Sequence, residues 1–291
     1  MIEFKEVEVK DKEWADELLR FSDFRGCEYS FGNNFMWSRV YDIKIARYKD
    51  FYIIKNKYGF VFPAGRGDTG EIVGVLRELC APEPLFFTSA DRNTMEKLRD
   101  MYPDEIRVST SRDYYDYIYE RESLSTLSGK KLHAKRNHLN RFYESDWAFE
   151  PITPENIGEC FKMSRRWRYE REQGVSEERD KEFEAVMRGM ENFFELGFVG
   201  GLLRVDGEVE AFTFGERLCG DTFVVHAEKA LTRVHGAYAA INREFVNYAC
   251  AEYKYINREE DMGVANLRKA KLSYHPVFMA EKFRILFKRV V

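Results

Sequence analysis

Hydrophobic and polar positions repeat along the chain with two different periods, which predicts a mixture of strands and helices. In the first half, apolar and polar side chains alternate between short turns, and this pattern predicts an antiparallel meander at Tyr41–Tyr48, Phe51–Lys55 and Gly59–Pro63. Helical spacing follows at Glu71–Leu79 and at Asp91–Met101, the latter beginning on a capping aspartate. Further strands are predicted at Pro84–Thr88, Glu105–Ser109 and Tyr114–Tyr119.

The second half shows the same periods in a clearer order. The predicted elements are, in chain order, a strand at Trp147–Pro151, helices at Pro154–Glu172 and Glu177–Leu196 separated by a loop at Gln173–Gly174, strands at Phe198–Val205, Val209–Glu216 and Thr222–His226, a helix at Gly236–Ala251, a strand at Tyr253–Asn257, a helix at Val264–Lys271 and one or two strands in Val277–Phe287. Asp206-Gly207 is a strong hairpin signal between the first two of the three successive strands.

This order is that of the GNAT-type acyl-N-acyltransferase fold, whose central sheet is mixed. The first half has a similar but weaker rhythm. We therefore predict an α+β protein with tandem GNAT-like domains at residues 1–127 and 146–291, joined by a basic linker helix at residues 128–145. No repeat is detectable in the residues themselves.

Composition narrows the class of protein. Of the 291 residues, 44% are apolar, 33% are charged and 15% are aromatic, as in a folded globular protein, and the net charge of -4 excludes a globally basic chain. There is no signal peptide pattern and no run of about 18 apolar residues, so we expect a cytoplasmic chain without an integral membrane segment. The five scattered cysteines form no CxxC pair, which favours reduced buried thiols and no metal site.

One segment is basic without a single acid. SGKKLHAKRNHLNRF predicts a helix with an apolar side at Leu132, Leu139 and Phe142. Its cationic side chains are the candidates for phosphate contacts with a nucleic acid: Lys130, Lys131, Lys135, Arg136 and Arg141. The alternative is a solvated linker helix that docks on acidic patches of its own protein.

A second candidate site lies at the end of a central strand. Alternation places His226 and Glu228 on one face, and either side chain is of a type that can accept a proton from an attacking amine or hydroxyl. The alternative is a surface pair of Glu228 with Lys229 beside a structural histidine.

The turn Arg233–Tyr238 precedes the predicted helix where enzymes that use acetyl-CoA carry [QR]xxGx[GA], whose backbone N–H groups hold a pyrophosphate. Arg233 and Gly236 fit that pattern, but Tyr238 stands where a small residue is needed. The motif is degenerate and argues against ordinary CoA binding, so no cofactor is expected.

The most densely polar stretch is NREEDMGVANLRKAKLSYHP, at residues 257–276. Glu260 and Asp261 are candidates to hold the α-amine of an aminoacyl donor, and Tyr274 is a candidate to protonate the departing oxygen. Asn257, Arg268 and Lys271 complete the proposed substrate-binding set. The alternative is a capping cluster, with acids before a helix and cations near its end, as the helix dipole prefers.

Three stretches resemble one family: residues 128–142, residues 224–245 and residues 256–276. They are similar to soluble bacterial proteins related to the C-terminal domain of phosphatidylglycerol lysyltransferase. The resemblance implies a tandem GNAT-like fold shared with Fem-type aminoacyltransferases, and an aminoacyl-tRNA as donor. Asn242, within the second stretch, joins the substrate-binding candidates, and Glu228, Asp261 and Tyr274 are the catalytic ones.

The leading functional hypothesis is therefore an aminoacyl or acyl transferase that takes an amino acid from an aminoacyl-tRNA-type donor. The acceptor is left open among a lipid, a peptide and a small amine. Two alternatives remain: an N-acyltransferase that uses acyl-CoA, and a non-catalytic module that binds RNA through the basic helix.

Overall fold

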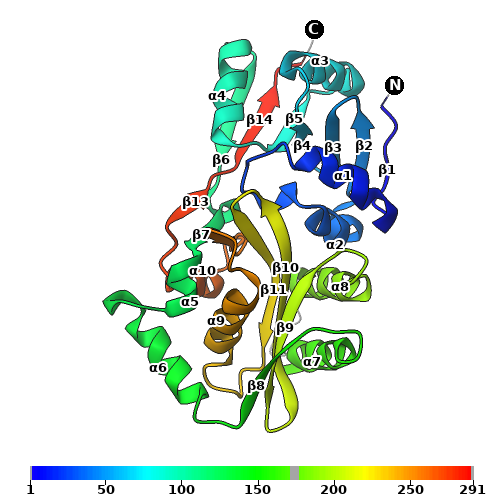
Figure 1. Ribbon diagram of the computed structural model, residues 1–291. Coiled ribbons are helices and arrows are strands. Elements are labelled where there is room, and N and C mark those ends of the chain that lie inside the picture. The colour runs from blue at the N-terminus through cyan, green and yellow to red at the C-terminus, as the bar shows by residue number, and fades with distance from the viewer. Residues whose placement is uncertain (1, 171–176, 290–291) are drawn as a thin grey trace. The chain divides into compact units, whose positions relative to one another are not determined.

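The computed structural model describes residues 2–170 and 177–289, which form two mixed sheets flanked by helices (Figure 1). The loop predicted at Gln173–Gly174 lies outside the described residues. Backbone contacts divide the chain into two compact units. Unit 1 comprises Met1–Asp116, Glu260–Gly263 and Met279–Val291, and unit 2 comprises Tyr117–Glu259 and Val264–Phe278. This division differs from the continuous domains predicted above, because unit 1 also takes two segments from the C-terminal part of the chain.

The sheet of unit 1 has the strand order β1-β2-β3-β4-β5-β14-β6. Its strands are β1 (Lys5–Glu6), β2 (Lys44–Tyr48), β3 (Phe51–Asn56), β4 (Gly59–Gly65), β5 (Phe86–Ser89), β14 (Phe283–Phe287) and β6 (Ile106–Thr110). The antiparallel meander predicted in the first half is confirmed as β2, β3 and β4. The pairing of β4 with β5 is parallel, which makes the sheet mixed.

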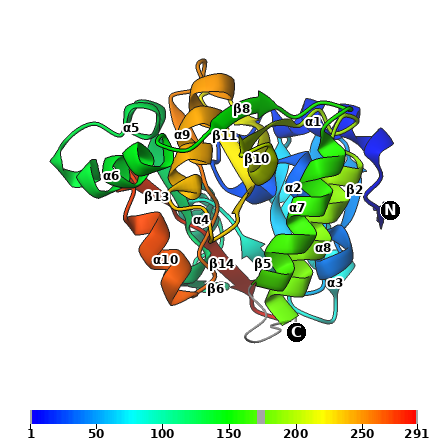
Figure 2. The ribbon, with the colours of Figure 1, turned by 90° about the horizontal axis from the view of Figure 1, so that it is seen from below.

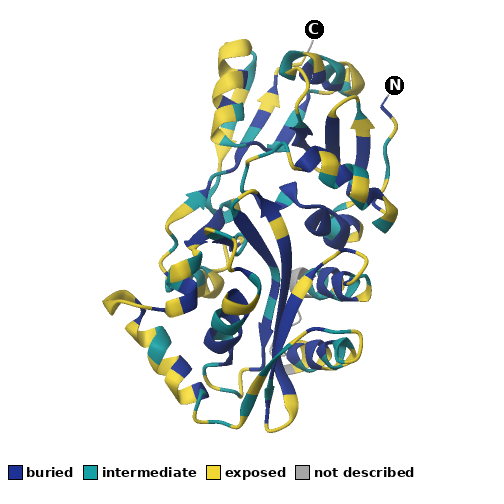
Figure 3. Cartoon of the chain, viewed as in Figure 1, coloured by how far each residue is buried: buried dark blue, intermediate teal, exposed yellow. Residues whose placement is uncertain are grey.

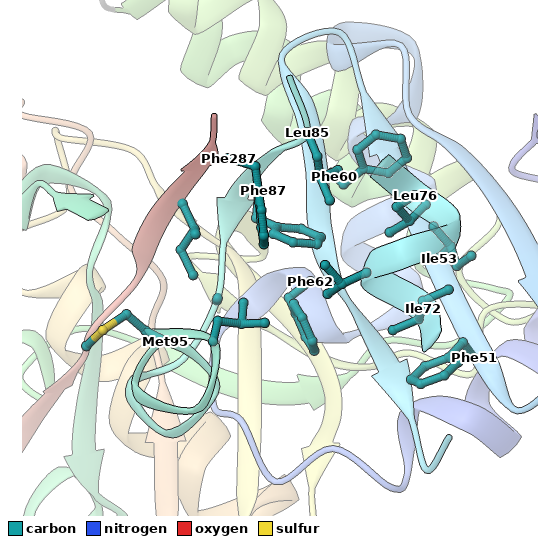
Figure 4. Packing of buried hydrophobic residues seen from close by; sticks show 14 of the residues in the cluster. Phe51, Ile53, Phe60, Phe62, Ile72, Leu76, Leu85, Phe87, Met95 and Phe287 are labelled. Atoms are coloured by element: carbon teal, nitrogen blue, oxygen red, sulfur yellow. The ribbon is translucent and has the colours of Figure 1, made fainter. Parts of the chain in front are cut away.

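Apolar side chains of this sheet pack against its helices. The helices of unit 1 are α1 (Lys12–Leu19), α2 (Phe31–Tyr41), α3 (Thr69–Cys80) and α4 (Arg92–Met101), with 3-10 turns at η1 (Val9–Asp11), η2 (Cys27–Tyr29) and η3 (Arg112–Tyr114). Figure 4 shows Phe60 and Phe62 of β4 near Ile72 and Leu76 of α3, all within one buried cluster. Burying each such side chain contributes about 1.5–3 kcal/mol.

Capping residues fix where these helices begin. The Asp91 carboxylate accepts a hydrogen bond of 2.7 Å from the backbone N–H of Thr94, which confirms the predicted cap of α4. Asp68 makes the equivalent bond to the N–H of Glu71 at the start of α3.

The second sheet, which lies mainly in unit 2, has the order β13-β7-β12-β11-β10-β9-β8. Its strands are β13 (Phe278–Ala280), β7 (Asp116–Glu120), β12 (Tyr255–Asn257), β11 (Thr222–Ala230), β10 (Glu208–Cys219), β9 (Val199–Val205) and β8 (Trp147–Pro151). The helices of this unit are α5 (Arg121–Thr126), α6 (His133–Phe142), α7 (Ile157–Glu170), α8 (Glu177–Glu191), α9 (Ala237–Ala249) and α10 (Ala265–Leu272), with a 3-10 turn at η4 (Lys130–Leu132). Helix α9 covers one face of the sheet, and α7 and α8 cover the other (Figure 2).

The two sheets repeat one topology, although the residues themselves show no repeat. In each, three antiparallel strands are followed by a helix and a strand that pairs in parallel: β2-β3-β4-α3-β5 in unit 1 and β9-β10-β11-α9-β12 in unit 2. The next strand is exchanged between the halves, since β14 lies beside β5 and β7 lies beside β12. Periodicity predicted both exchanged strands, but it carries no information on the sheet to which a strand belongs.

The strands of unit 2 create a divergence that positions the site. The predicted hairpin is confirmed: Asp206 and Gly207 have φ of 50° and 80°, a pair of left-handed residues that turns β9 into β10. Strand β11 pairs with β12 at only three positions, the last being Val224 with Asn257. Beyond that point β11 continues to Ala230 paired with β10 but not with β12. Arg258, which follows Asn257, contacts this part of β11 through its side chain.

The basic segment is organised differently from the prediction. The helix predicted over residues 128–142 is split into η4 and α6, and Leu132 is the N-terminal cap residue of α6. Helix α6 packs against α9 and belongs to unit 2. Figure 3 shows α6 largely exposed, and its buried positions are Leu139 and Phe142, on the apolar side that the sequence predicted.

Among the residues that the structure describes, no helix combines the length and the apolar character needed to span a lipid bilayer.

Candidate active site at the diverging strands

A buried ionic cluster bridges β11 and the segment after β12, at the point where the two strands diverge. The Glu228 carboxylate accepts a hydrogen bond of 2.7 Å from Nη2 of Arg258 and one of 2.8 Å from Nδ2 of Asn242 on α9. The side chains of Glu228 and Arg258 are each 11% exposed, and Asn242 is buried. A carboxylate, a guanidinium and an amide from three different elements thus meet at one place.

Two tyrosines enclose the guanidinium of this cluster. The guanidinium carbon of Arg258 lies 4.6 Å from the ring centroid of Tyr274 and 5.5 Å from that of Tyr119. The ammonium of Lys135, from α6, lies 4.0 Å from the centroid of the same Tyr274 ring. Cation–π contacts of this kind are worth more when the cation has lost water, as both of these have in part. Lys135 of the basic helix and Tyr274, which follows α10, therefore belong to one site.

Burial and neighbouring charges set the protonation of these groups. Burial, assisted by the charge of Arg258, lowers the pKa of Lys135 to about 8, so a neutral amine is accessible near physiological pH. Burial raises the pKa of the Tyr274 hydroxyl well above its ordinary value. Tyr274 is thus a hydrogen-bond donor and a weak acid. For Arg258, burial opposes the charge, but Glu228 and the tyrosines leave its pKa above the ordinary value.

Other predicted residues shape this cluster through the backbone. The ammonium of Lys271 donates to the carbonyl oxygen of Arg258 at 2.6 Å, and the hydroxyl of Tyr119 donates to the carbonyl oxygen of Lys271 at 2.8 Å. Asn257 is fully buried, and its side-chain oxygen accepts from the N–H of Glu259. Lys271 and Asn257 therefore position the Arg258 segment.

His226 is held between two carboxylates. Its Nε2 lies 3.0 Å from a Glu216 oxygen, its Nδ1 lies 2.9 Å from a Glu259 oxygen, and only 1% of its side chain is exposed. Burial alone would lower the pKa of His226, but the two carboxylates raise it to about 9. The ring is therefore a cation with both nitrogens donating, so it has no free lone pair with which to act as a base.

The His226 clamp predicts a pH-dependent stability. Since the folded pKa of about 9 lies above the ordinary value of 6.5, the stabilisation is complete below pH 6.5 and is lost as the pH rises through 9. The loss is expected to be on the order of 3 kcal/mol. Urea unfolding at pH 6 and pH 9 measures it, with His226→Gln as the control in which this part of the pH dependence disappears. An equal pH dependence in both proteins would contradict the clamp.

Two predicted acids lie in unit 1 and have partners there. Asp261 is fully buried, with Oδ2 3.0 Å from Nη1 of Arg112 and Oδ1 accepting from the N–H of Gly263. Glu260 lies 3.7 Å from the ammonium of Lys282. Both carboxylates are engaged in ion pairs within unit 1.

Lys282 is the centre of a second buried ionic cluster, in unit 1. Its ammonium lies 2.7 Å from Asp116 and 2.9 Å from Glu28, and its side chain is 4% exposed. The Cys27 sulfur lies 3.5 Å away, and the N–H of Cys27 donates to Asp116 at 2.7 Å. Donor atoms of Cys27, Glu28 and Asp116 lie within 4.8 Å of one another, but the ammonium already supplies the positive charge that these groups attract.

The remaining basic residues proposed to bind phosphate or substrate differ in their surroundings. Lys130, Lys131 and Arg141 are exposed and available to a polyanion. Arg136 instead donates to the carbonyl oxygens of Leu127 and Gly129, closing the loop before η4. Arg268 lies half-buried on α10, one turn before Lys271.

Arg258 and Lys282 were missed as site residues. Arg258 lies inside the polar stretch that the sequence singled out, but a lone arginine between an asparagine and three acids reads as part of a surface charge run. The feature that could have identified Arg258 is its position directly after the short strand β12, where that strand diverges from β11. Lys282 gives no local signal, since its partners lie up to 255 residues away.

Comparison with known proteins identifies the family. The family model described as "Phosphatidylglycerol lysyltransferase, C-terminal" matches residues 19–286. The chain belongs to this family. The resemblance inferred from the three polar stretches is therefore confirmed, and it extends to the first half, where the sequence pattern was weak.

Several solved structures have a fold similar to that of this chain. A conserved protein of unknown function from Bacteroides thetaiotaomicron is 38% identical, with a TM-score of 0.92 over 99% of this chain and 100% of that one. The structure of L-PGS from Bacillus licheniformis is 15% identical, with a TM-score of 0.66 over 97% and 93%. FemX is 7% identical, with a TM-score of 0.65 over 99% and 98%. The predicted α+β architecture of tandem GNAT-like units with mixed sheets is thus confirmed.

Proposed function

We propose that this protein transfers the amino acid of an aminoacyl-tRNA to an amine or hydroxyl acceptor at the Glu228–Arg258–Asn242 cluster. The observation that carries the proposal is the meeting of Lys135, from the basic helix, with Tyr274 and Arg258 within one unit. A donor with a phosphate backbone and a reactive ester needs both a basic surface and a polar reaction site. An aminoacyl-tRNA donor would place the reaction in the cytoplasm.

The groups of the cluster match the steps of acyl transfer from an ester. The acceptor's nitrogen or oxygen attacks the ester carbonyl, and the bond from that carbon to the tRNA oxygen breaks. Glu228 is the carboxylate placed to take the proton that the acceptor loses, since His226 has no free lone pair. The Arg258 charge faces the negative charge that develops on the carbonyl oxygen. The neutral hydroxyl of Tyr274 is placed to donate a proton to the departing oxygen of the tRNA.

Transfer of a radiolabelled amino acid tests this proposal. Purified protein is incubated with labelled aminoacyl-tRNA and with separated lipid, peptide and small-molecule fractions of a cell extract. The proposal expects label in an alkali-sensitive ester or a stable amide in one fraction, dependent on the protein. Label that remains on the tRNA, or is released only as free amino acid, in every fraction would contradict it.

The acyl-CoA alternative is less well supported by the turn Arg233–Tyr238. Gly236 has φ of 84°, and a side chain at its Cα would place Cβ 2.2 Å from the carbonyl oxygen of His138. Helix α6 thus lies against the start of α9 and presents an acceptor oxygen, which would repel a phosphate. The guanidinium of Arg233 is bonded to buried Glu210, with Nε 3.1 Å from Oε2.

Calorimetry with CoA is expected to show no saturable binding at millimolar concentration, because the helix N-terminus that would hold the pyrophosphate is covered. A dissociation constant in the micromolar range, lost in Arg233→Ala, would contradict this expectation and favour the acyl-CoA alternative.

Salt dependence tests the basic surface. Replacing Lys130 and Lys131 by alanine is expected to weaken tRNA binding and to reduce the slope of log K against log salt by about 1.4–1.8, since each phosphate contact contributes about 0.7–0.9. The control replaces two exposed lysines of unit 1, Lys97 and Lys288, by alanine and should leave the slope unchanged. An equal change in both double variants would show that only net charge matters.

A further inference from the structure

Two buried polar atoms of the residues that hold the Glu228 carboxylate form no hydrogen bond within the part of the chain that the structure describes. They are Nη1 of Arg258 and Oδ1 of Asn242. Asn242 is 2% exposed, and Arg258 has 11% of its side chain exposed. A buried donor or acceptor without a partner costs about 1–3 kcal/mol, so such atoms are rare outside sites that receive a partner.

The orientation of the Asn242 amide is fixed by its neighbour. Nδ2 donates to the Glu228 carboxylate at 2.8 Å, and a carboxylate cannot donate in return, so the amide nitrogen must face Glu228 and Oδ1 must face away. The same carboxylate holds Nη2 of Arg258 at 2.7 Å, which leaves the N–H bonds of Nη1 directed elsewhere. One acceptor and one cationic donor are therefore presented beside a single negative charge.

We infer that this pair recognises the α-aminoacyl group itself: Asn242 Oδ1 accepts from its free α-ammonium, and Arg258 Nη1 donates to its carbonyl oxygen. The inference rests on the proposed function and deepens it, since it names the feature by which the site selects an aminoacyl group over a plain acyl group. The ammonium carries the positive charge that Glu228 attracts, and the carbonyl oxygen is the acceptor that the guanidinium lacks.

Selection follows from the chemistry of the unpaired atoms. An Nα-acetylated group has lost the ammonium charge and adds bulk beside Asn242. A group without the amine leaves Oδ1 buried and unpaired. Sites built around buried polar groups reject analogues that lack the matching group far more strongly than apolar pockets reject a change of size. The free α-amine is thus expected to decide which acyl group enters.

Small stable analogues provide the test. L-alaninamide and L-lysinamide serve as stand-ins for the aminoacyl ester, each compared with its Nα-acetyl and des-amino counterparts in a titration followed by NMR. The free amine is expected to bind at least about tenfold more tightly than both counterparts. Equal affinity, or no binding by any of these probes at tens of millimolar, would overturn the inference and leave the two atoms as positions for bound water only.

Variants assign the preference to the pair. Asn242→Ala is expected to abolish the preference for the free amine. Asn242→Asp, which keeps an acceptor oxygen, is expected to retain it. Asn247→Ala, an exposed position on the same helix, is the matched control and should bind as wild type. Circular dichroism on each variant confirms folding. A preference that survives Asn242→Ala in a folded protein would overturn the assignment.

The outcomes for the two proposals are separable. Amino acid transfer from tRNA without a preference for the free α-amine would sink the recognition model and leave the transferase function standing. A preference lost in Asn242→Ala, with no transfer to any fraction, would sink the transferase function and leave an α-amine recognition site.

Discussion

Glutamine in place of Glu228 is expected to lower the rate of amino acid transfer by about 100-fold or more, the usual contribution of a positioned acid or base. Glutamine keeps the size of the side chain and still accepts from Arg258, so the fold should persist. It removes the charge that takes the acceptor's proton and that holds Arg258 and Asn242 in place. Single-turnover transfer from labelled aminoacyl-tRNA measures the effect.

The matched control for this substitution is Glu252→Gln, an exposed glutamate in the turn after α9. It should transfer within about twofold of wild type, as surface substitutions rarely perturb a fold. A folded Glu228→Gln variant with a rate near that of wild type would remove Glu228 from the mechanism. A pH profile that shifts in Glu228→Gln, with binding of tRNA unchanged, would support its role in proton transfer.

Removal of Lys282 is expected to have the largest effect on stability. Lys282→Ala leaves Asp116, which is fully buried, without its ammonium partner at 2.7 Å. Breaking a buried ion pair on one side typically costs about 3–5 kcal/mol. Urea unfolding followed by tryptophan fluorescence measures this cost for wild type and variant.

Lys288→Ala is the control, because this lysine is exposed near the end of the chain, and a change of about 0.5 kcal/mol or less is expected. The double variant Lys282→Met with Asp116→Asn should recover part of the loss, since no charge is then left buried alone. If Lys282→Ala were as stable as wild type, the ammonium would not hold these acids together in solution.

How far the sequence determined the fold can be judged from single elements. The Asp206-Gly207 hairpin and the Asp91 cap were predicted correctly, because a turn that needs two left-handed residues and a helix that needs an acceptor leave local signatures. The sheets to which β7 and β14 belong were not predicted. Both are plain alternating strands, and their exchange between the sheets depends on contacts more than 100 residues apart in sequence.

The candidate site was also predicted only in part, because its contacts join residues far apart in sequence. Glu228, Asn242 and Tyr274 do come together, along with Lys135 from the basic helix. Glu228 and Tyr274 both contact Arg258, an arginine that was interpreted as part of a surface charge run. For Glu260 and Asp261 the order of charges could not show that two cations of unit 1, Lys282 and Arg112, engage them. Spacing along the chain indicates which residues are polar, and only long-range packing determines their partners.

The proposed mechanism requires an aminoacyl group to bind where β11 and β12 diverge. A crystal structure of the protein with a non-hydrolysable amide analogue of an aminoacyl-adenosine tests it most directly. We expect the aminoacyl carbonyl oxygen to lie within about 3.5 Å of Nη1 of Arg258 and the α-nitrogen to lie within the same distance of Oδ1 of Asn242. The proposed aminoacyl site would be contradicted by an analogue that binds elsewhere and makes no contact with the side chains of Glu228, Asn242 and Arg258.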